Sequence, residues 1–249
     1  MGDPSPLPTR EAYALWAATY GAENAVTHLE HRAVRTLTPD LAGLRLLDAA
    51  CGTGRRLPRP GAGGPACAIG IDLVPEMLAR ARRPRIANGN PAARTAATGT
   101  PVAAPPAVAP LLAAADLRAL PFADDRFDVV WCRLALGHLA ELGPAYTELA
   151  RVACHGAHVI VTDFHPAAAR AGHVRSFRDR DGLLHVVEHH IHDPDVHAAA
   201  ARDAGLTLID RIEPEVGPAV RHFYQAAGRL AAYHEQRALP LVLALAFRA

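Results

Sequence analysis

Short apolar runs of strand-like character recur along the chain, and the stretches between them have helical character. They lie at 44–50, 67–73, 111–117, 127–134, 157–164 and 205–212, and a further one follows at 239–247. Near-continuous apolar strands that alternate with helices are typical of a parallel sheet buried on both faces. The pattern predicts an α/β fold with a doubly wound, seven-stranded, mostly parallel sheet.

Three further segments complete the predicted organisation. Residues 10–37 read as a helix with a break near Gly21, and residues 221–238 read as another helix. Residues 84–110 are rich in Pro, Ala, Thr and Gly and lack periodicity, which predicts a flexible loop, with a functional lid as the alternative. We expect one domain over 1–249, with an N-terminal helical cap (1–40) and a substrate-cap insert (165–200) between the fifth and sixth strands.

Composition excludes several classes of protein. The 26 Lys and Arg residues balance 25 Asp and Glu residues, so a protein that coats nucleic acid is not expected. Half of the residues are hydrophobic, which excludes a disordered chain. There is no apolar run of the length that spans a membrane, and the four cysteines form no C-x-x-C pair. We therefore expect a cytoplasmic protein with free thiols, as a monomer or homodimer, without membrane or nucleic-acid partners.

The segment LLDAACGTGR at 46–55 joins an apolar strand to a glycine-rich turn. Small residues there let the backbone approach a ligand closely, and Asp72 follows at the end of the next strand, where it can accept hydrogen bonds from ribose hydroxyls. A dinucleotide site would need a third glycine at position 57, which is Leu57 followed by Pro58. The pattern indicates a nucleoside-containing cofactor and disfavours NAD.

Several motifs in order resemble the class I S-adenosylmethionine (SAM)-dependent methyltransferases, in the group that includes the ubiquinone-type and small-molecule enzymes. They are LLDAACGTGR, GIDLVPEMLARAR, ADLRALPFADDRFDVVWCRLALGHL, ELARV and VIVTDFHP. The resemblance extends over nearly the whole chain. It implies a Rossmann-like fold, SAM as cofactor and S-adenosylhomocysteine as product.

The resemblance also implies which residues bind the cofactor. In the family the glycine-rich loop (48–54 here) holds the methionine part, Asp72 binds the ribose hydroxyls, Asp116 accepts from the adenine amino group, and Tyr20 closes over the site. The implied cofactor-binding residues are Tyr20, Asp48, Ala50, Gly52, Gly54, Asp72, Leu73, Met77, Asp116, Leu117 and Arg133.

Two features depart from the family pattern. Ala50 stands where the family has its first glycine. Pro58 and Pro60 fall where the family has a regular helix, and a proline in a helix interior costs about 3 kcal/mol. We therefore expect the first helix after the glycine-rich loop to be short or displaced.

Methyl transfer depends mainly on alignment, and a base is needed only where the nucleophile carries a proton of high pKa. His138 follows the fourth strand and His165 the fifth, so both are candidate catalytic bases, with positioning or packing as the alternative. The candidate substrate residues are Tyr13, Trp16, His173, Arg175 and His189.

Nine of the fourteen histidines lie between 155 and 197. A metal site within His165–His197, with Glu188 nearby, is one interpretation. No zinc-type spacing is present, so we predict no metal and expect these histidines to line or solvate the substrate pocket.

The predicted function is methyl transfer from SAM to an O, N or C nucleophile of a small molecule. The Arg- and Ala-rich composition is typical of high-GC bacteria, which associates the substrate with secondary metabolism. The alternatives are a metal-assisted methyltransferase that uses the histidine cluster and a SAM-binding domain without catalysis.

Overall fold

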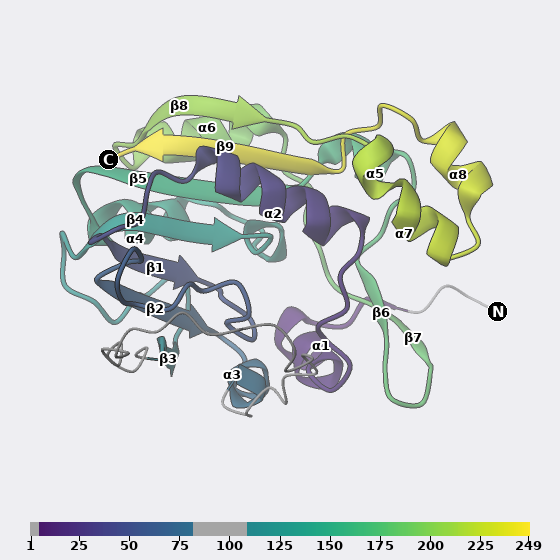
Figure 1. Cartoon of the computed structure of the whole chain (residues 1–249), viewed down its shortest axis with the longest axis horizontal. Coiled ribbons are helices and arrows are strands. Elements are labelled where there is room, and N and C mark those ends of the chain that lie inside the picture. Colours follow the sequence, from purple (N-terminus) through teal and green to yellow (C-terminus); the bar gives the residue numbers. More distant parts are fainter. Residues whose placement is uncertain (1–4, 82–108) are drawn as a thin grey trace, which may run out of the picture.

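A seven-stranded sheet forms the centre of the molecule in a computed structural model that describes residues 5–81 and 109–249 (Figure 1). The strand order is β3-β2-β1-β4-β5-β9-β8. The strands are β1 (Arg45–Ala49), β2 (Cys67–Asp72), β3 (Leu111–Ala114), β4 (Phe127–Arg133), β5 (Ala153–Phe164), β8 (Thr207–Ile212) and β9 (Val242–Arg248). The first five pair in parallel, and β9 runs antiparallel to both β5 and β8. The predicted doubly wound, mostly parallel sheet is confirmed.

Helices cover both faces of this sheet. The helices are α1 (Thr9–Trp16), α2 (Ala25–Leu37), α3 (Pro75–Ala81), α4 (Gly143–Val152), α5 (Pro166–Arg170), α6 (Pro194–Asp203), α7 (Arg221–Ala226) and α8 (Leu230–Glu235), with short 3-10 turns η1 (Leu136–His138) and η2 (Pro218–Val220). A hairpin of β6 (Ser176–Arg178) and β7 (Leu184–Val186) projects beyond the sheet beside α1 (Figure 1). No helix in the described part of the chain has the length and apolarity to cross a membrane.

Neighbouring residues of β1 show why its apolar run is continuous. Leu46 packs with Val34 of α2 on one face, and Leu47 packs with Leu149 of α4 on the other. Both leucines are fully buried because successive side chains of a strand point to opposite faces.

The N-terminal helical segment is interrupted near Gly21, as predicted. Asn24 begins α2 with a capping box, in which its side chain accepts from the Thr27 amide and the Thr27 hydroxyl accepts from the Asn24 amide, each at 3.0 Å. Residues 17–24 form a bend between α1 and α2, here called the N-terminal bend. It brings the start of α2 to the carboxyl end of the sheet.

The connection between β1 and β2 contains no helix. All of residues 50–66 are described, and they form turns and extended segments. Pro58 and Pro60 account for this, because each removes a backbone donor and fixes φ. Leu57 is buried in the layer that Leu46 and α2 form, so the loop still covers this face of the sheet. The sequence predicts a short or displaced helix here, whereas the structure has no helix between β1 and β2.

Other predictions need correction. Residues 221–238 form two short helices, because Gly228 takes a left-handed conformation with φ 67° between them. The last part of the predicted 165–200 insert is α6, which packs on α4 and belongs to the sheet layers. The cap is therefore residues 165–193. The predicted loop 84–110 lies almost entirely outside the described residues. All four cysteines are free, and only Cys132 is fully buried.

Candidate active site

A cavity of about 560 Å³ opens at the carboxyl ends of β1, β2 and β4. Its walls come from the glycine-rich loop, the N-terminal bend with α1 and α2, the turn η1 after β4, and the cap. Crevices outside the carboxyl ends of parallel strands are the usual ligand sites of such folds, and the volume is typical of small-molecule sites.

The glycine-rich loop passes beneath Tyr20 and Met77. A Cβ placed on Gly52 would lie 3.4 Å from the Met77 side chain and 3.9 Å from the Tyr20 ring, and Gly52 has φ 58°. Ala50 also lies in the left-handed region, with φ 73°. That conformation costs an L-residue roughly 1–2 kcal/mol. Because position 50 holds alanine where the family pattern has glycine, the loop is strained at this position.

Asp72 holds the glycine-rich loop against the end of β2. Its Oδ2 accepts from the Gly52 amide at 2.7 Å, and its Oδ1 accepts from the Val74 amide at 2.9 Å. Burial raises the pKa of Asp72, and these two hydrogen bonds oppose the rise. Each carboxylate oxygen has further lone pairs, so the residue can still accept from ribose hydroxyls.

Asp48 lies at the floor of the cavity with an unused acceptor. Its side chain is buried, and its Oδ1 has no hydrogen-bond partner among the described residues. Burial raises its pKa to about 7. A buried acceptor without a partner costs free energy unless a ligand or water supplies a donor.

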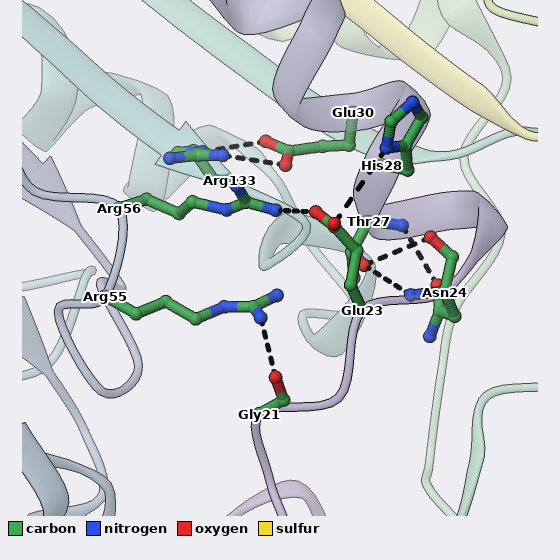
Figure 2. A network of polar contacts seen from close by, with 9 residues as sticks. All are labelled: Gly21, Glu23, Asn24, Thr27, His28, Glu30, Arg55, Arg56 and Arg133. Carbon is green, nitrogen blue, oxygen red and sulfur yellow. Dashed lines mark hydrogen bonds and ion pairs between the residues drawn. The ribbon is translucent and has the colours of Figure 1, made fainter. Parts of the chain in front are cut away.

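Glu30 of α2 closes the site from one side by binding Arg133 (Figure 2). Arg133 donates through Nε and Nη2 to the two carboxylate oxygens, each at 2.7 Å, and both side chains are less than a tenth exposed. Arg133 lines the cavity as predicted, but its guanidinium is already committed to Glu30.

Two arginines of the glycine-rich connection reach the N-terminal bend (Figure 2). Arg55 donates to the Gly21 carbonyl at 2.9 Å, and Arg56 pairs with Glu23. Arg55 lines the cavity and has no carboxylate partner in the described part of the chain.

The opposite end of the cavity holds a chain of polar contacts between α1, η1 and the cap. Arg175 donates through Nη1 to the Tyr13 hydroxyl at 2.9 Å and to the Leu134 carbonyl at 3.1 Å. The Tyr13 hydroxyl lies 3.0 Å from His138 Nε2, and His138 Nδ1 lies 3.1 Å from the Glu188 carbonyl. A carbonyl only accepts, so we assign the proton to Nδ1, and Nε2 accepts from Tyr13.

His138 is neutral at pH 7. Burial, and then the charge of Arg175, lower its pKa from 6.5 to about 3. The ring is thus a hydrogen-bond acceptor for Tyr13 and a weak acceptor of protons.

Most of the predicted site residues lie around this one cavity. They are Tyr13, Trp16, Tyr20, Asp48, Ala50, Gly52, Asp72, Leu73, Met77, Asp116, Leu117, Arg133, His138 and Arg175. Among them, Asp116 has its carboxylate bound by Arg118 through Nε and Nη2, at 3.1 and 2.7 Å.

Four predicted residues do not line the cavity: Gly54, His165, His173 and His189. Gly54 serves the turn, with its amide donating to the Cys51 carbonyl. His165 is used as the N-cap of α5, where Nδ1 accepts from the Ala167 amide, and its Nε2 lies 3.6 Å from Glu213. His165 follows β5 as predicted, but its side chain caps α5 and does not reach the cavity, because the chain turns into α5 immediately after it.

The other two histidines lie behind the cavity wall. His173 packs against Phe164, with ring centroids 6.3 Å apart. His189 packs behind His138 and over Gly137, where a Cβ would meet its ring at 2.0 Å. His189 therefore supports the wall that carries His138.

The histidine-rich segment does not converge on one point. His185 binds Asp179 at 2.7 Å, His192 lies 2.8 Å from the Leu139 carbonyl, and His197 lies 3.0 Å from the Tyr146 hydroxyl. Within residues 5–81 and 109–249, no group of three or more His, Cys, Asp or Glu side chains is arranged to hold a metal ion.

Sequence reasoning missed Glu30 and Arg55. The signal for Glu30 is its place in the buried stripe of α2, where an acidic residue shares a face with Ala33, Val34 and Leu37. A buried carboxylate needs a partner, and the stripe alone does not say which one.

Residues 47–161 match the methyltransferase domain family. Among solved structures, the chain resembles an S-adenosylmethionine-dependent methyltransferase from Mesorhizobium loti, at 20% identity and a TM-score of 0.59, over 89% of this chain and 98% of that one. It also resembles a chain in the complex of the Haloferax volcanii Trm112 methyltransferase activator, at 18% identity, 97% of both chains and a TM-score of 0.63.

A third similar structure is the [4+2]-cyclase SpnF, at 20% identity and a TM-score of 0.59, with 99% of this chain and 98% of that one covered. At these identities the structural likenesses concern the fold. The domain match covers residues 47–161, and the chain has the fold of these solved structures.

Proposed function

We propose that this protein is a SAM-dependent methyltransferase that acts on a small molecule, at an O, N or C nucleophile, with cofactor and acceptor side by side in the cavity described above. The observation that carries the proposal is that two groups of residues line the cavity and adjoin each other at Tyr13 and Tyr20, whose ring centroids lie 6.2 Å apart. The glycine-rich loop and Asp72 form one end, and Tyr13, His138 and Arg175 form the other.

The residues of the first end fit SAM. Asp48 offers a buried acceptor without a partner, and Gly52 leaves room that a side chain would occupy. Asp72 would hold the ribose hydroxyls. Arg55, whose one partner in the described part of the chain is a backbone carbonyl, would hold the carboxylate of the methionine part. Arg133 would not, because Glu30 already occupies it.

SAM supplies a methyl group bonded to a cationic sulfur. The chain's own contribution is to orient the acceptor and exclude water, and alignment of this kind is the main requirement of the reaction. Tyr13, Trp16 and Leu134 line the acceptor end. His138 reaches that end through the Tyr13 hydroxyl, so we assign it the positioning of Tyr13 and a subordinate part in proton transfer.

The low pKa of His138 favours one kind of acceptor. A base works best when its pKa lies near the working pH, and a pKa of about 3 is far below it. Acceptors whose nucleophile needs no strong base, such as a neutral amine, a carboxylate or an acidic hydroxyl, therefore suit this site better than an aliphatic alcohol.

Titration of the protein with S-adenosylhomocysteine, wild type beside Asp72→Ala, tests the cofactor site. We expect the variant to bind at least about tenfold more weakly, because it loses the ribose acceptor and the support of Gly52. Asp40→Ala is the matched control, since Asp40 Oδ1 accepts from the amide two residues on at 3.1 Å but lies outside the cavity. Equal affinities of the two variants would exclude the proposed cofactor site.

Release of S-adenosylhomocysteine from SAM across a panel of small-molecule acceptors tests catalysis. Turnover with any acceptor supports the proposed function. Tight cofactor binding without turnover would favour a SAM-binding domain that performs no methyl transfer.

A further inference from the structure

Arg175 reaches the acceptor end of the cavity with half of its guanidinium unused. Among the described residues, its hydrogen bonds are both made by Nη1, to the Tyr13 hydroxyl and the Leu134 carbonyl. Nε and Nη2 have no hydrogen-bond partner among the described residues, yet neither is sealed off by protein. These two atoms form the planar edge with which arginine binds a carboxylate through two parallel hydrogen bonds.

Other arginines of this chain use that same edge to hold a carboxylate. The pairs are Arg45 with Asp128, Arg118 with Asp116, Arg133 with Glu30 and Arg151 with Glu148. In each pair Nε and Nη2 both donate, at distances from 2.6 to 3.1 Å. Arg175 has the same edge, and no acidic side chain among the described residues binds it.

The groups around Arg175 do not neutralise it by direct contact. Asp163 is buried and its charge acts on Arg175, but its Oδ1 accepts from the Phe164 amide at 2.7 Å and its Oδ2 lies 3.6 Å from His197. Glu188 is exposed at the cavity rim and makes no ion pair with Arg175 in the described part of the chain. Tyr13 and His138 are engaged with one another. A buried cation without a paired anion is costly, so the site favours an anionic ligand.

The cofactor already has its own cation. Arg55 lies beside the glycine-rich loop and Tyr20, where the methionine part of SAM is proposed to lie. Arg175 also acts on Tyr20 by its charge, but its hydrogen bonds go to the Tyr13 hydroxyl and to the carbonyl of Leu134, which follows β4. The guanidinium of Arg175 is therefore available to the methyl acceptor.

We propose that the methyl acceptor carries a carboxylate, which binds the Nε–Nη2 edge of Arg175. This inference rests on the proposed function and narrows its substrate class to small organic acids. Arg175 is thus a specificity-determining residue, since a neutral molecule of the same shape would leave the guanidinium unpaired.

Small acids and their primary amides, which match in shape, probe the Arg175 edge directly and do not require the acceptor itself. The probes are acetate with acetamide, propionate with propionamide and benzoate with benzamide. Each is titrated into the protein saturated with S-adenosylhomocysteine. We expect at least one acid to bind about tenfold or more tightly than its amide, because charge-assisted hydrogen bonds are the stronger ones.

Variants of Arg175 test whether this residue causes the preference for acids over their amides. Arg175→Gln should remove it, and Arg175→Lys, which keeps the charge but not the planar edge, should keep only part of it. Arg178→Gln is the matched control, since Arg178 lies in the same cap with an exposed side chain that donates to the Gly182 carbonyl. It should bind acids like the wild type.

Binding of S-adenosylhomocysteine separates the possible failures. If the wild type does not bind it, the proposed function itself is wrong. If the wild type binds it but no acid binds better than its amide, only the carboxylate proposal is overturned. The proposal is also overturned if Arg175→Gln loses cofactor affinity as strongly as acid affinity, because Arg175 would then serve the cofactor or the fold.

Discussion

The two ends of the cavity are built in different ways. The cofactor end is made by strand ends and the turns that follow them. Backbone amides hold it together: the Cys51 amide donates to the Ile71 carbonyl, and the Gly52 amide donates to the Asp72 carboxylate. The acceptor end is assembled from α1, η1 and the cap, which are distant in sequence. Tyr13 and Arg175, which bond to each other there, are 162 positions apart.

This difference separates the part of the cavity that the fold determines from the part that is particular to this chain. Hydrogen bonds of a parallel sheet determine where its strand ends lie, so the cofactor end follows from the fold. The acceptor end depends on a few side-chain contacts between loops and short helices, which vary more readily. Substrate choice is therefore expected to reside in the acceptor end, and stability in the cofactor end.

Removal of Glu30 should have the largest effect and should fall on the cofactor end. Glu30→Ala leaves the guanidinium of Arg133 buried without a partner, which destabilises a protein by about 3–5 kcal/mol. Denaturant-induced unfolding of the variant beside the wild type measures the change.

The matched control is Glu23→Ala, which breaks the more exposed pair with Arg56. Exposed pairs contribute about 0–1 kcal/mol, so this variant should remain near the wild type. Equal losses in the two variants would show that the buried pair has no special part in holding α2 to the sheet.

Lowering the pH should decrease the free energy of unfolding through His138, at the acceptor end. Between pH 6.5 and about 3 the unfolded chain binds a proton that the folded ring does not, so the stabilisation is complete above pH 6.5 and is lost as the pH falls. In His138→Gln, the free energy of unfolding should therefore rise less steeply with pH between 5 and 7, by up to about 1.4 kcal/mol per pH unit.

Unfolding curves at several pH values measure this slope. His155→Gln is the control, because His155 is exposed at the start of β5 and far from the cavity wall. If His138→Gln kept the slope of the wild type, the ring would titrate in the folded state as it does in the unfolded chain.

The smallest effect is expected at the strained turn of the cofactor end. Ala50→Gly removes a left-handed alanine and should stabilise the fold by up to about 1 kcal/mol, the strain relieved being partly offset by the greater freedom of glycine in the unfolded chain. Ala238→Gly is the comparison, since Ala238 has φ 63° and lies outside the cavity.

Thermal unfolding should place both variants above the wild type, and titration with S-adenosylhomocysteine should distinguish them. Only Ala50→Gly is expected to change cofactor affinity, because only Ala50 lines the cavity. A loss of stability in Ala50→Gly would mean that the alanine side chain contributes more by packing than its conformation costs.

Periodicity and turn chemistry predicted the sheet, the break near Gly21 and a disturbed helix at Pro58 and Pro60, where the structure has none. Each of these depends on local physics: alternation in a strand, the freedom of glycine and the missing donor of proline. The single helix expected over 221–238 was wrong for a related reason, since Gly228 ends one helix there and its effect depends on the packing around it.

The acceptor end could not be predicted to the same degree. In the sequence, His138 and His165 each follow a predicted strand. In the structure, His165 caps a helix, whereas His138 lies within hydrogen-bond distance of Tyr13. The motif likewise marks Arg133 without showing that Glu30, on another helix, already holds it.

The sequence by itself determined the sheet, the glycine-rich turn and the acidic strand ends, because neighbouring residues along the chain specify them. The tertiary structure alone decided the partners of the charged side chains: Glu30 for Arg133, the Gly21 carbonyl for Arg55, and no acid for Arg175 among the residues that the structure describes. A side chain's charge is written in the sequence, but whether that charge is neutralised depends on which distant residues the fold brings within hydrogen-bond distance.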